Sequence, residues 1–173
     1  CDTMPGLILG VELCEDLWAP VPPSSALAQA GATLILNLSA SDEVVGKADY
    51  RRQLVTGQSA RLVCGYVYAD AGEGESSTDM VFAGHNLIAE NGALLAERRF
   101  STGLTISELD VDRLVYERRR MTSFSPASGR LLSLPFSLSP TTTTLTRPIS
   151  PTPFVPEDTG DRKARCEEIL AIA

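Results

Sequence analysis

The feature that most constrains the fold is an apolar run at residues 7–11, which leads directly into a polar segment containing Cys14. The run reads Leu-Ile-Leu-Gly-Val and lacks the alternation of apolar and polar residues seen in half-exposed strands. Continuous apolar strands are typical of parallel sheets. Because α/β proteins bind ligands at the carboxyl ends of such strands, we expect Cys14 at a functional edge of the sheet.

Cys14 is open to two interpretations. A thiol in this place would lie beside the backbone N–H groups of the following turn, which favour a thiolate and can stabilise a developing oxyanion. A free cysteine can equally be a small, buried apolar residue, and most free cysteines are structural. The strand and the turn by themselves do not decide between a nucleophile and a core residue.

Alternating helices and strands follow Cys14. The pattern predicts a helix over about 22–30, a strand over 33–38, a helix over 47–62 and a strand over 63–69. Ser24 or Ser25 is expected to cap the first helix, and Gly31 to end it. Because strand-helix-strand units pair their strands in parallel, residues 37–41 should lie at the same sheet edge as Cys14.

A meander is expected after these parallel units. Three short strands are predicted, at residues 81–82, 86–89 and 94–96. Asn91-Gly92 supplies the positive-φ positions of a tight hairpin turn between the last two. The fold class is therefore α/β.

Composition excludes several kinds of protein. The chain has 173 residues and a net charge of −7, which argues against a nucleic-acid surface or a polybasic membrane patch. Its apolar runs are shorter than a membrane span requires, and we expect a cytoplasmic location. The four cysteines, at positions 1, 14, 64 and 166, form neither a zinc motif nor a disulfide framework.

Several motifs, in a consistent order, carry a resemblance to a known family. Residues 10–18, Gly-Val-Glu-Leu-Cys-Glu-Asp-Leu-Trp, resemble the nucleophile segment of the nitrilase superfamily of carbon–nitrogen hydrolases. Residues 71–79, 82–88 and 90–92 resemble, more narrowly, the glutaminase domain of the glutamine-dependent NAD synthetases. The resemblance implies a nitrilase-type α-β-β-α sandwich, of which this chain holds the second half. Half a sandwich should leave an apolar sheet face exposed, with poor solubility as the consequence.

The resemblance also implies a domain organisation. Residues 1–120 correspond to the C-terminal half of the glutaminase domain. Residues 121–157, rich in proline, serine and threonine, are expected to form a linker or extended arm. Residues 158–173 resemble the first helix of the ATP-using synthetase domain, truncated where the sequence stops.

In the family, a glutamate, a lysine and a cysteine perform the chemistry, and Cys14 matches the nucleophile. The backbone N–H of Glu15 matches the oxyanion donor. The family's glutamate and lysine precede the cysteine by many tens of residues, and no lysine stands among the thirteen residues before Cys14. We therefore expect this chain to be an internal fragment that is inactive alone.

By resemblance, the Glu15 side chain, Ser41 and Lys47 bind glutamine. The alternatives are that Glu15 caps the following turn and that Lys47 is a solvated lysine of a first helical turn. No metal is expected, because the acidic loop at residues 73–79 lacks the D-x-D-x-D-G spacing of a calcium site. His85, the only histidine, is expected to be structural.

The implied function is hydrolysis of the glutamine amide, with the ammonia passing to ATP-dependent conversion of deamido-NAD to NAD. ATP and magnesium belong to the synthetase domain, and no cofactor is expected in this part. Expected partners are glutamine, the synthetase domain of the same chain and further copies in a homo-oligomer. A stand-alone nitrilase-family amidohydrolase and a catalytically silent assembly module remain alternatives.

Overall fold

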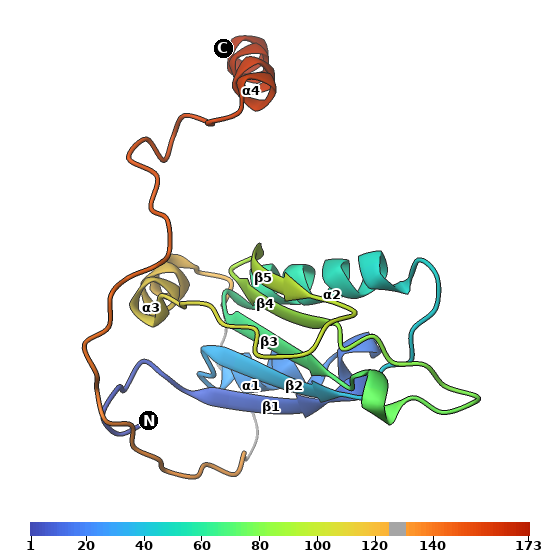
Figure 1. Ribbon diagram of the computed structural model, residues 1–173. Helices are drawn as coiled ribbons and strands as arrows, with labels where there is room; N and C mark the ends of the chain where they lie inside the picture. The colour runs from blue at the N-terminus through green and yellow to red at the C-terminus, as the bar shows by residue number, and fades with distance from the viewer. Residues whose placement is uncertain (125–130) are drawn as a thin grey trace. The chain divides into compact units, whose positions relative to one another are not determined.

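The computed structural model describes residues 1–124 and 131–173 and contains two compact units, residues 1–143 and residues 144–173 (Figure 1). The first unit is built on one five-stranded sheet in the order β1-β2-β3-β4-β5. Its strands are β1 (Leu9–Leu13), β2 (Leu34–Ser39), β3 (Gly65–Asp70), β4 (Asn86–Glu90) and β5 (Ala93–Arg98). Its helices are η1 (Cys14–Trp18), α1 (Pro23–Gln29), α2 (Lys47–Leu62), η2 (Glu73–Glu75) and α3 (Val111–Arg120).

The topology agrees with the order of elements expected from the sequence. Strands β1, β2 and β3 are parallel, whereas β4 and β5 continue the sheet in antiparallel pairing. In the register of the first pair, Leu13 lies opposite Leu38. Cys14, which follows β1, and Ser39, the last residue of β2, therefore lie at the same edge of the sheet, as predicted.

The predicted hairpin is confirmed between β4 and β5. Its turn contains Asn91 and Gly92 with φ angles of +46° and +87°, the combination that a two-residue hairpin turn requires. The third predicted strand, at residues 81–82, is wrong. Gly84 adopts a φ of +57°, which ends the extended run two residues later, and the Phe82 N–H bonds to the side chain of Ser76 instead of to a neighbouring strand.

The predicted caps of α1 are wrong as well, although its extent and its stop at Gly31 agree with the sequence. The N-cap is Pro22, so Ser24 lies inside the first turn. There the Ser24 N–H donates to the buried carboxylate of Glu12 over 2.8 Å. The Glu12 carboxylate on β1 therefore accepts from a first-turn N–H of α1, a role that an N-cap side chain would otherwise have.

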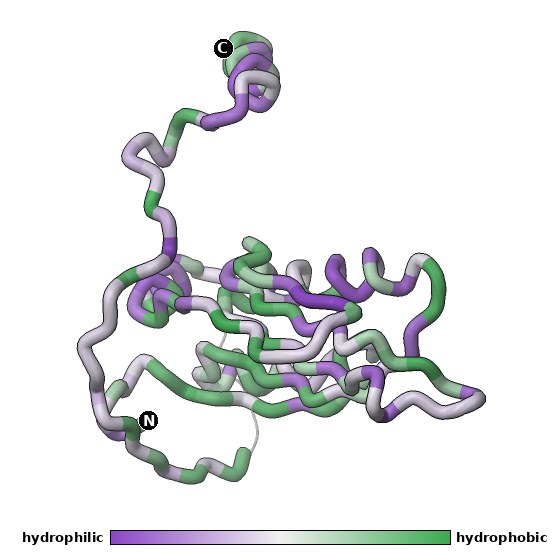
Figure 2. The backbone as a smooth tube through the Cα atoms, viewed as in Figure 1, coloured by the Kyte–Doolittle hydropathy of each residue, from purple (hydrophilic) through white to green (hydrophobic). Residues whose placement is uncertain are grey.

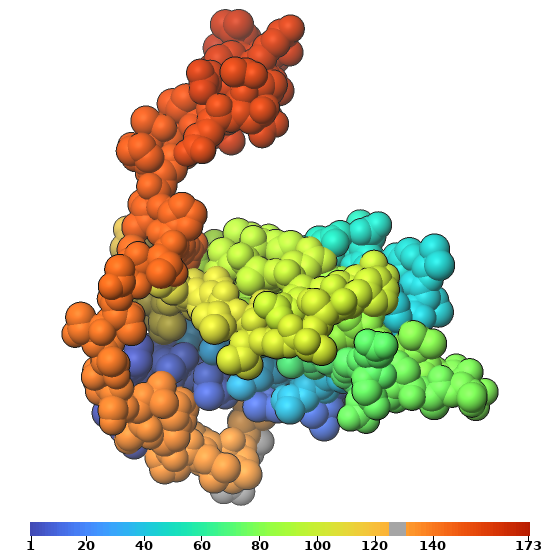
Figure 3. All heavy atoms as spheres, viewed as in Figure 1, coloured from blue at the N-terminus to red at the C-terminus, as the bar shows by residue number. Residues whose placement is uncertain are grey.

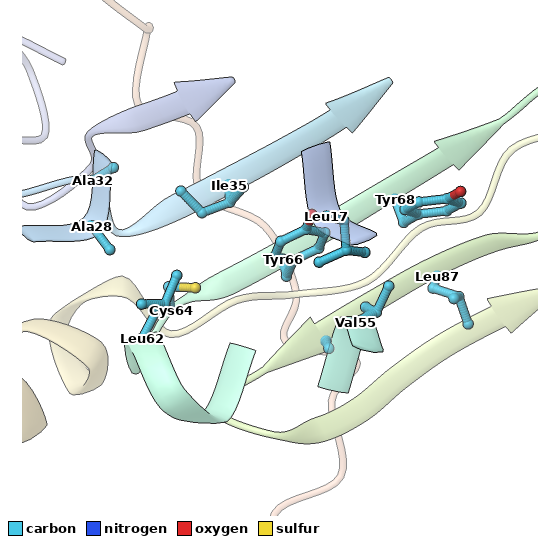
Figure 4. Packing of buried hydrophobic residues seen from close by; sticks show 11 residues of the cluster. Leu17, Ala28, Ala32, Ile35, Val55, Leu62, Cys64, Tyr66, Tyr68 and Leu87 are labelled. Carbon is cyan, nitrogen blue, oxygen red and sulfur yellow. The ribbon is translucent and has the colours of Figure 1, made fainter. Parts of the chain in front are cut away.

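Helices α1 and α2 cover one face of the sheet (Figure 1), and the buried side chains of the core gather on that face (Figure 4). Ile35, Tyr66 and Tyr68 point into this layer and are fully buried. Gly10 allows the close approach of α1, since a Cβ at this position would lie 3.1 Å from Leu27 Cβ of that helix. Buried and exposed residues alternate along β1 because of this one-sided cover, so the expectation of a strand that is not half-exposed is wrong.

The opposite face of the sheet is apolar and largely open at β1 and β2. Val11 is 53% exposed and Leu13 60% exposed, and Figure 2 shows the hydrophobic colouring of both strands. The segment between β5 and α3 lies over the neighbouring strands (yellow in Figure 3). It is held there by a hydrogen bond that the Asp110 N–H donates to the Glu90 carboxylate. The open face agrees with the expectation for half of a sandwich.

The second unit consists of irregular chain followed by α4 (Thr159–Ile172). Asp158 caps this helix by accepting a hydrogen bond from the Asp161 N–H. A helix at this place agrees with the sequence, while its assignment to a synthetase domain stays a prediction. Within the described residues, no helix is long and apolar enough to cross a membrane.

Candidate active site

Cys14 follows β1 directly and is the first residue of η1. Its backbone φ is +45°, in the left-handed region that residues with a Cβ rarely adopt. Such a conformation costs on the order of 1 kcal/mol or more and is concentrated at functional sites. The sharp turn ends the strand and brings Cys14 to the wall of a cavity at the sheet edge.

A buried hydrogen-bonded chain lies beneath this turn. The Asn37 side-chain amide donates to the carbonyl of Cys14 over 3.4 Å and to the Tyr66 hydroxyl over 3.1 Å. Tyr66 in turn donates to Glu12. Burial, together with the nearby Glu12 carboxylate, raises the pKa of Tyr66 well above its ordinary value, so the phenol stays protonated and acts as the donor.

The cavity has a volume of about 380 Å³ and an open mouth. Its lining comes from η1, the loop after β2 and the start of α2, and comprises Cys14, Glu15, Trp18, Ala40, Ser41, Asp42 and Lys47. The structure thus brings together all four residues that the sequence singled out for the site. It does so because two neighbouring parallel strands end at the same edge.

Lys47, the first residue of α2, is held inside the cavity. Its ammonium donates to the Asp42 carboxylate over 2.6 Å and to the Asp42 carbonyl over 2.8 Å, and it lies 5.4 Å from the centre of the Trp18 ring. The hydrogen bond from Lys47 lowers the pKa of Asp42. Lys47 is only 19% exposed, so the alternative interpretation of a solvated lysine does not hold.

Ser41 is buried and held from two sides. Its N–H donates to the Asp70 carboxylate over 2.8 Å, and its hydroxyl accepts a hydrogen bond from Arg51 over 3.1 Å. Asp70 is the last residue of β3 and lies at the same edge of the sheet, and burial raises the pKa of its carboxyl group. Ser41 is therefore a fixed part of the cavity wall.

Glu15 is exposed and lines the cavity beside Cys14. The turn is closed by its neighbour, because the Leu13 N–H donates to the Asp16 carboxylate over 2.8 Å. The carboxylate that caps this turn is therefore Asp16, and the alternative interpretation of Glu15 as the cap is wrong. The Glu15 N–H belongs to the first turn of η1, where amides lack an acceptor within the helix.

His85 is fully buried immediately before β4. Its Nδ1 lies 2.9 Å from Arg51 Nη1, and its Nε2 lies 2.7 Å from Glu97 Oε1. Because arginine only donates, Nδ1 accepts and the proton is on Nε2, which donates to Glu97. Both ring nitrogens are used in this way, which favours the structural role expected for this histidine.

Sequence reasoning missed three residues that shape the site, namely Asn37, Asp42 and Arg51. Arg51 gave a usable signal, since it precedes Val55 by four residues and therefore belongs to the buried face of α2. The roles of Asn37 and Asp42 depend on contacts with other elements and left no local signal. Among the described residues, no group of three or more histidine, cysteine or acidic side chains is arranged to hold a metal ion.

Comparison with known proteins identifies relatives along almost the whole chain. No protein-family model matches it. The glutamine-dependent NAD(+) synthetase of Mycobacterium tuberculosis is 41% identical over 181 residues, which cover 98% of this chain and 27% of that protein. The chain thus spans about a quarter of the length of the curated relatives it matches.

Solved structures give a consistent result. The glutamine-dependent NAD+ synthetase of Acinetobacter baumannii in complex with ADP matches with a TM-score of 0.55 at 28% identity, over 61% of this chain and 20% of that one. Nit3 of Saccharomyces cerevisiae, a member of branch 10 of the nitrilase superfamily, matches with a TM-score of 0.56 at 20% identity, over 66% of this chain and 42% of that one. The second match shows that the sheet and its helices have the nitrilase fold.

Proposed function

This chain is homologous along nearly its whole length to a segment of the glutamine-dependent NAD synthetases, and we propose that it carries the nucleophile and part of the glutamine pocket of such an enzyme. The observation that carries the proposal is the placement of Cys14 in a left-handed turn, on the wall of a cavity shared with Ser41 and Lys47. A nucleophile, a hydroxyl and a cation around one opening suit a small substrate with an amide and an α-carboxylate.

In the proposed reaction, Cys14 Sγ attacks the side-chain amide carbon of glutamine. The carbon–sulfur bond forms, the carbon–nitrogen bond breaks, and ammonia leaves with the proton that a general base transfers. Water then cleaves the thioester and releases glutamate and the free thiol. The Glu15 N–H contributes to the oxyanion hole, and a single donor of this kind commonly supplies roughly 3 kcal/mol.

The family's glutamate base and its lysine belong, by resemblance, to a part of the protein that precedes Cys14. Within the present chain, Lys47 and Ser41 are proposed to bind the α-carboxylate of glutamine, and Glu15 its α-ammonium. Lys47 is held by Asp42 at 2.6 Å, so its position is set before the substrate arrives. A preorganised cation of this kind lowers the entropic cost of binding a free amino acid.

The ammonia is proposed to serve a synthetase domain that uses ATP and magnesium to convert deamido-NAD to NAD. The 41% identity to proteins named for that reaction supports this use, and α4 is proposed to be the first helix of that domain. We also propose a cytoplasmic protein that forms homo-oligomers.

The test compares NAD formation driven by glutamine with NAD formation driven by ammonium, in the complete protein. Cys14→Ala should abolish the first reaction and preserve the second, whereas Cys166→Ala, at an exposed cysteine of α4, should change neither. If Cys14→Ala leaves both reactions intact, Cys14 is structural. Cleavage of simple amides without any NAD formation would favour a stand-alone amidohydrolase instead.

A further inference from the structure

Arg51 is a fully buried arginine in the second turn of α2, four residues after Lys47. A buried guanidinium has to be paired and hydrogen-bonded, because an unpaired charge in the interior costs several kcal/mol. The hydrogen-bond partners of Arg51 therefore indicate which part of the molecule its guanidinium holds in place.

Those partners are concentrated in three consecutive residues of the loop between β2 and α2. Arg51 donates to the Ser41 hydroxyl over 3.1 Å, to the Asp42 carbonyl over 3.3 Å and to the Glu43 carboxylate over 2.9 Å. Beyond the loop, Arg51 contacts His85 Nδ1 at 2.9 Å, the Asp70 carboxylate at 3.9 Å and the Tyr68 ring at 6.0 Å from its centre. The planar guanidinium presents five donors in a rigid fork, whereas an ammonium is a compact point charge on a flexible stem, so arginine is the better residue to fix several acceptors in one geometry.

Two of the three loop residues set the binding groups of the proposed glutamine pocket, namely the Ser41 hydroxyl and the Lys47 ammonium. Ser41 lines the cavity itself, and Asp42 holds the Lys47 ammonium through its carboxylate and its carbonyl. The Asp42 carbonyl thus accepts from Arg51 and from Lys47 at the same time. A displacement of Arg51 is therefore transmitted to the hydroxyl and to the cation of the pocket.

We propose that Arg51 is a positioning residue that sets the affinity for glutamine by holding Ser41, Asp42 and Glu43 in their binding geometry. The inference rests on the proposed function, since it concerns the same pocket. Arg51 acts through the loop and is not among the residues that line the cavity, so it is not a catalytic residue.

The decisive variant is Arg51→Lys in the complete protein, measured as KM and kcat for glutamine and, separately, as the ammonium-driven reaction. The KM for glutamine should rise about tenfold, the effect of losing one or two hydrogen bonds to a charged group, and the ammonium-driven rate should stay unchanged. Arg118→Lys is the matched control, because Arg118 binds the carbonyls of Ala32, Leu62 and Val63 with a similar fork. It should lower thermal stability without changing the KM.

A second readout does not depend on synthesis. Glutamine should protect Cys14 from iodoacetamide, measured by mass spectrometry of the Cys14 peptide, and Arg51→Lys should raise the half-protecting glutamine concentration about tenfold. Glu43→Gln, which weakens the same anchor and preserves its shape, should change KM and protection in the same direction by a smaller factor. This variant serves if Arg51→Lys does not fold.

The outcomes separate the two proposals. If Cys14→Ala preserves the glutamine-driven reaction, the proposed function itself fails. If Cys14→Ala abolishes that reaction while KM and protection remain at wild-type values in Arg51→Lys, the positioning role is wrong. The same conclusion follows if Arg51→Lys lowers the glutamine-driven and ammonium-driven rates in parallel, since that pattern indicates general structural damage.

Discussion

The side-chain amide of Asn37 lies directly beneath the Cys14 turn and donates to the Cys14 carbonyl over 3.4 Å. Asn37 is on β2 and Cys14 follows β1, so the contact joins two parallel strands at their carboxyl ends. The same amide donates to Tyr66 on β3. One buried residue therefore links three strands to the strained backbone of the proposed nucleophile.

Asn37→Ala is expected to slow the chemistry more than it weakens binding. Without the amide, the Cys14 turn loses a tertiary support, and small errors in the position of a nucleophile reduce rates by about 10- to 100-fold. The kcat of glutamine-driven NAD formation should fall by that factor while the KM changes little. Thr56→Ala, which removes a hydroxyl bonded to its own helix, is the control and should leave kcat unchanged.

Tyr66→Phe is expected to destabilise the fold. The Glu12 carboxylate would lose its phenolic donor in a buried environment, and an unsatisfied buried group of this kind costs about 1–3 kcal/mol. Urea denaturation measures the difference in the free energy of unfolding. Tyr116→Phe, at an exposed ring of α3, should change that free energy by less than about 0.5 kcal/mol. Equal effects of the two variants would rule out the buried network as the cause.

Because His85 is buried, we expect the protein to lose stability in acid. Burial lowers its pKa in the folded state, although the hydrogen bond to Glu97 acts in the opposite direction. The unfolded chain therefore binds more protons below a pH of about 6.5, so the stabilisation is present above that pH and is lost as the pH falls toward the folded pKa. A protonated ring would also turn a second donor toward Arg51.

The check is the free energy of unfolding at pH about 7 and pH about 5 for the wild type and for His85→Gln. The loss between the two pH values should be smaller in the variant, which carries no titrating group at this position. The nearby Glu43, Glu97 and Arg51 charges are present in both proteins, so the difference reports the histidine together with its lowering of the Glu97 pKa. Equal losses in the two proteins would show that His85 does not titrate in this range.

The cysteines should differ in their reaction with iodoacetamide. Cys64 is fully buried, and burial raises its pKa to about 12, so it should stay unmodified in the native protein at neutral pH. Cys14 lies on the wall of an open cavity and should be modified. Mass spectrometry of the two peptides measures the ratio. Modification of Cys64 at the rate of Cys14 would contradict the burial that the fold assigns to it.

The open face of the sheet predicts self-association of this chain when it is produced alone. Val11 and Leu13 are more than half exposed, and contiguous apolar surface of this kind favours association or aggregation. Val11→Lys should shift the chain toward smaller species in size-exclusion chromatography. A sharp monomeric peak for the unmodified chain, with a cooperative thermal transition, would contradict the prediction.

Local patterns in the sequence were sufficient for the elements that lie within one stretch of chain. The helix over 47–62 agrees with α2 at both ends, and Asn91-Gly92 forms the expected hairpin turn. Residues 81–82 misled the prediction, because two apolar residues look like a short strand while Gly84 and the Ser76 hydroxyl determine the local backbone.

The sequence by itself determined the alternation of strands and helices, the place of Cys14 after an apolar strand and the resemblance to the synthetases. Only the tertiary structure decided that Arg51 holds the loop at Ser41, that Asp42 pairs with Lys47 and that Asn37 supports Cys14. The physical reason is that periodicity and turn chemistry act over a few neighbouring residues. The partner of a buried polar group depends instead on strand register and helix placement, which are set by the packing of the whole sheet.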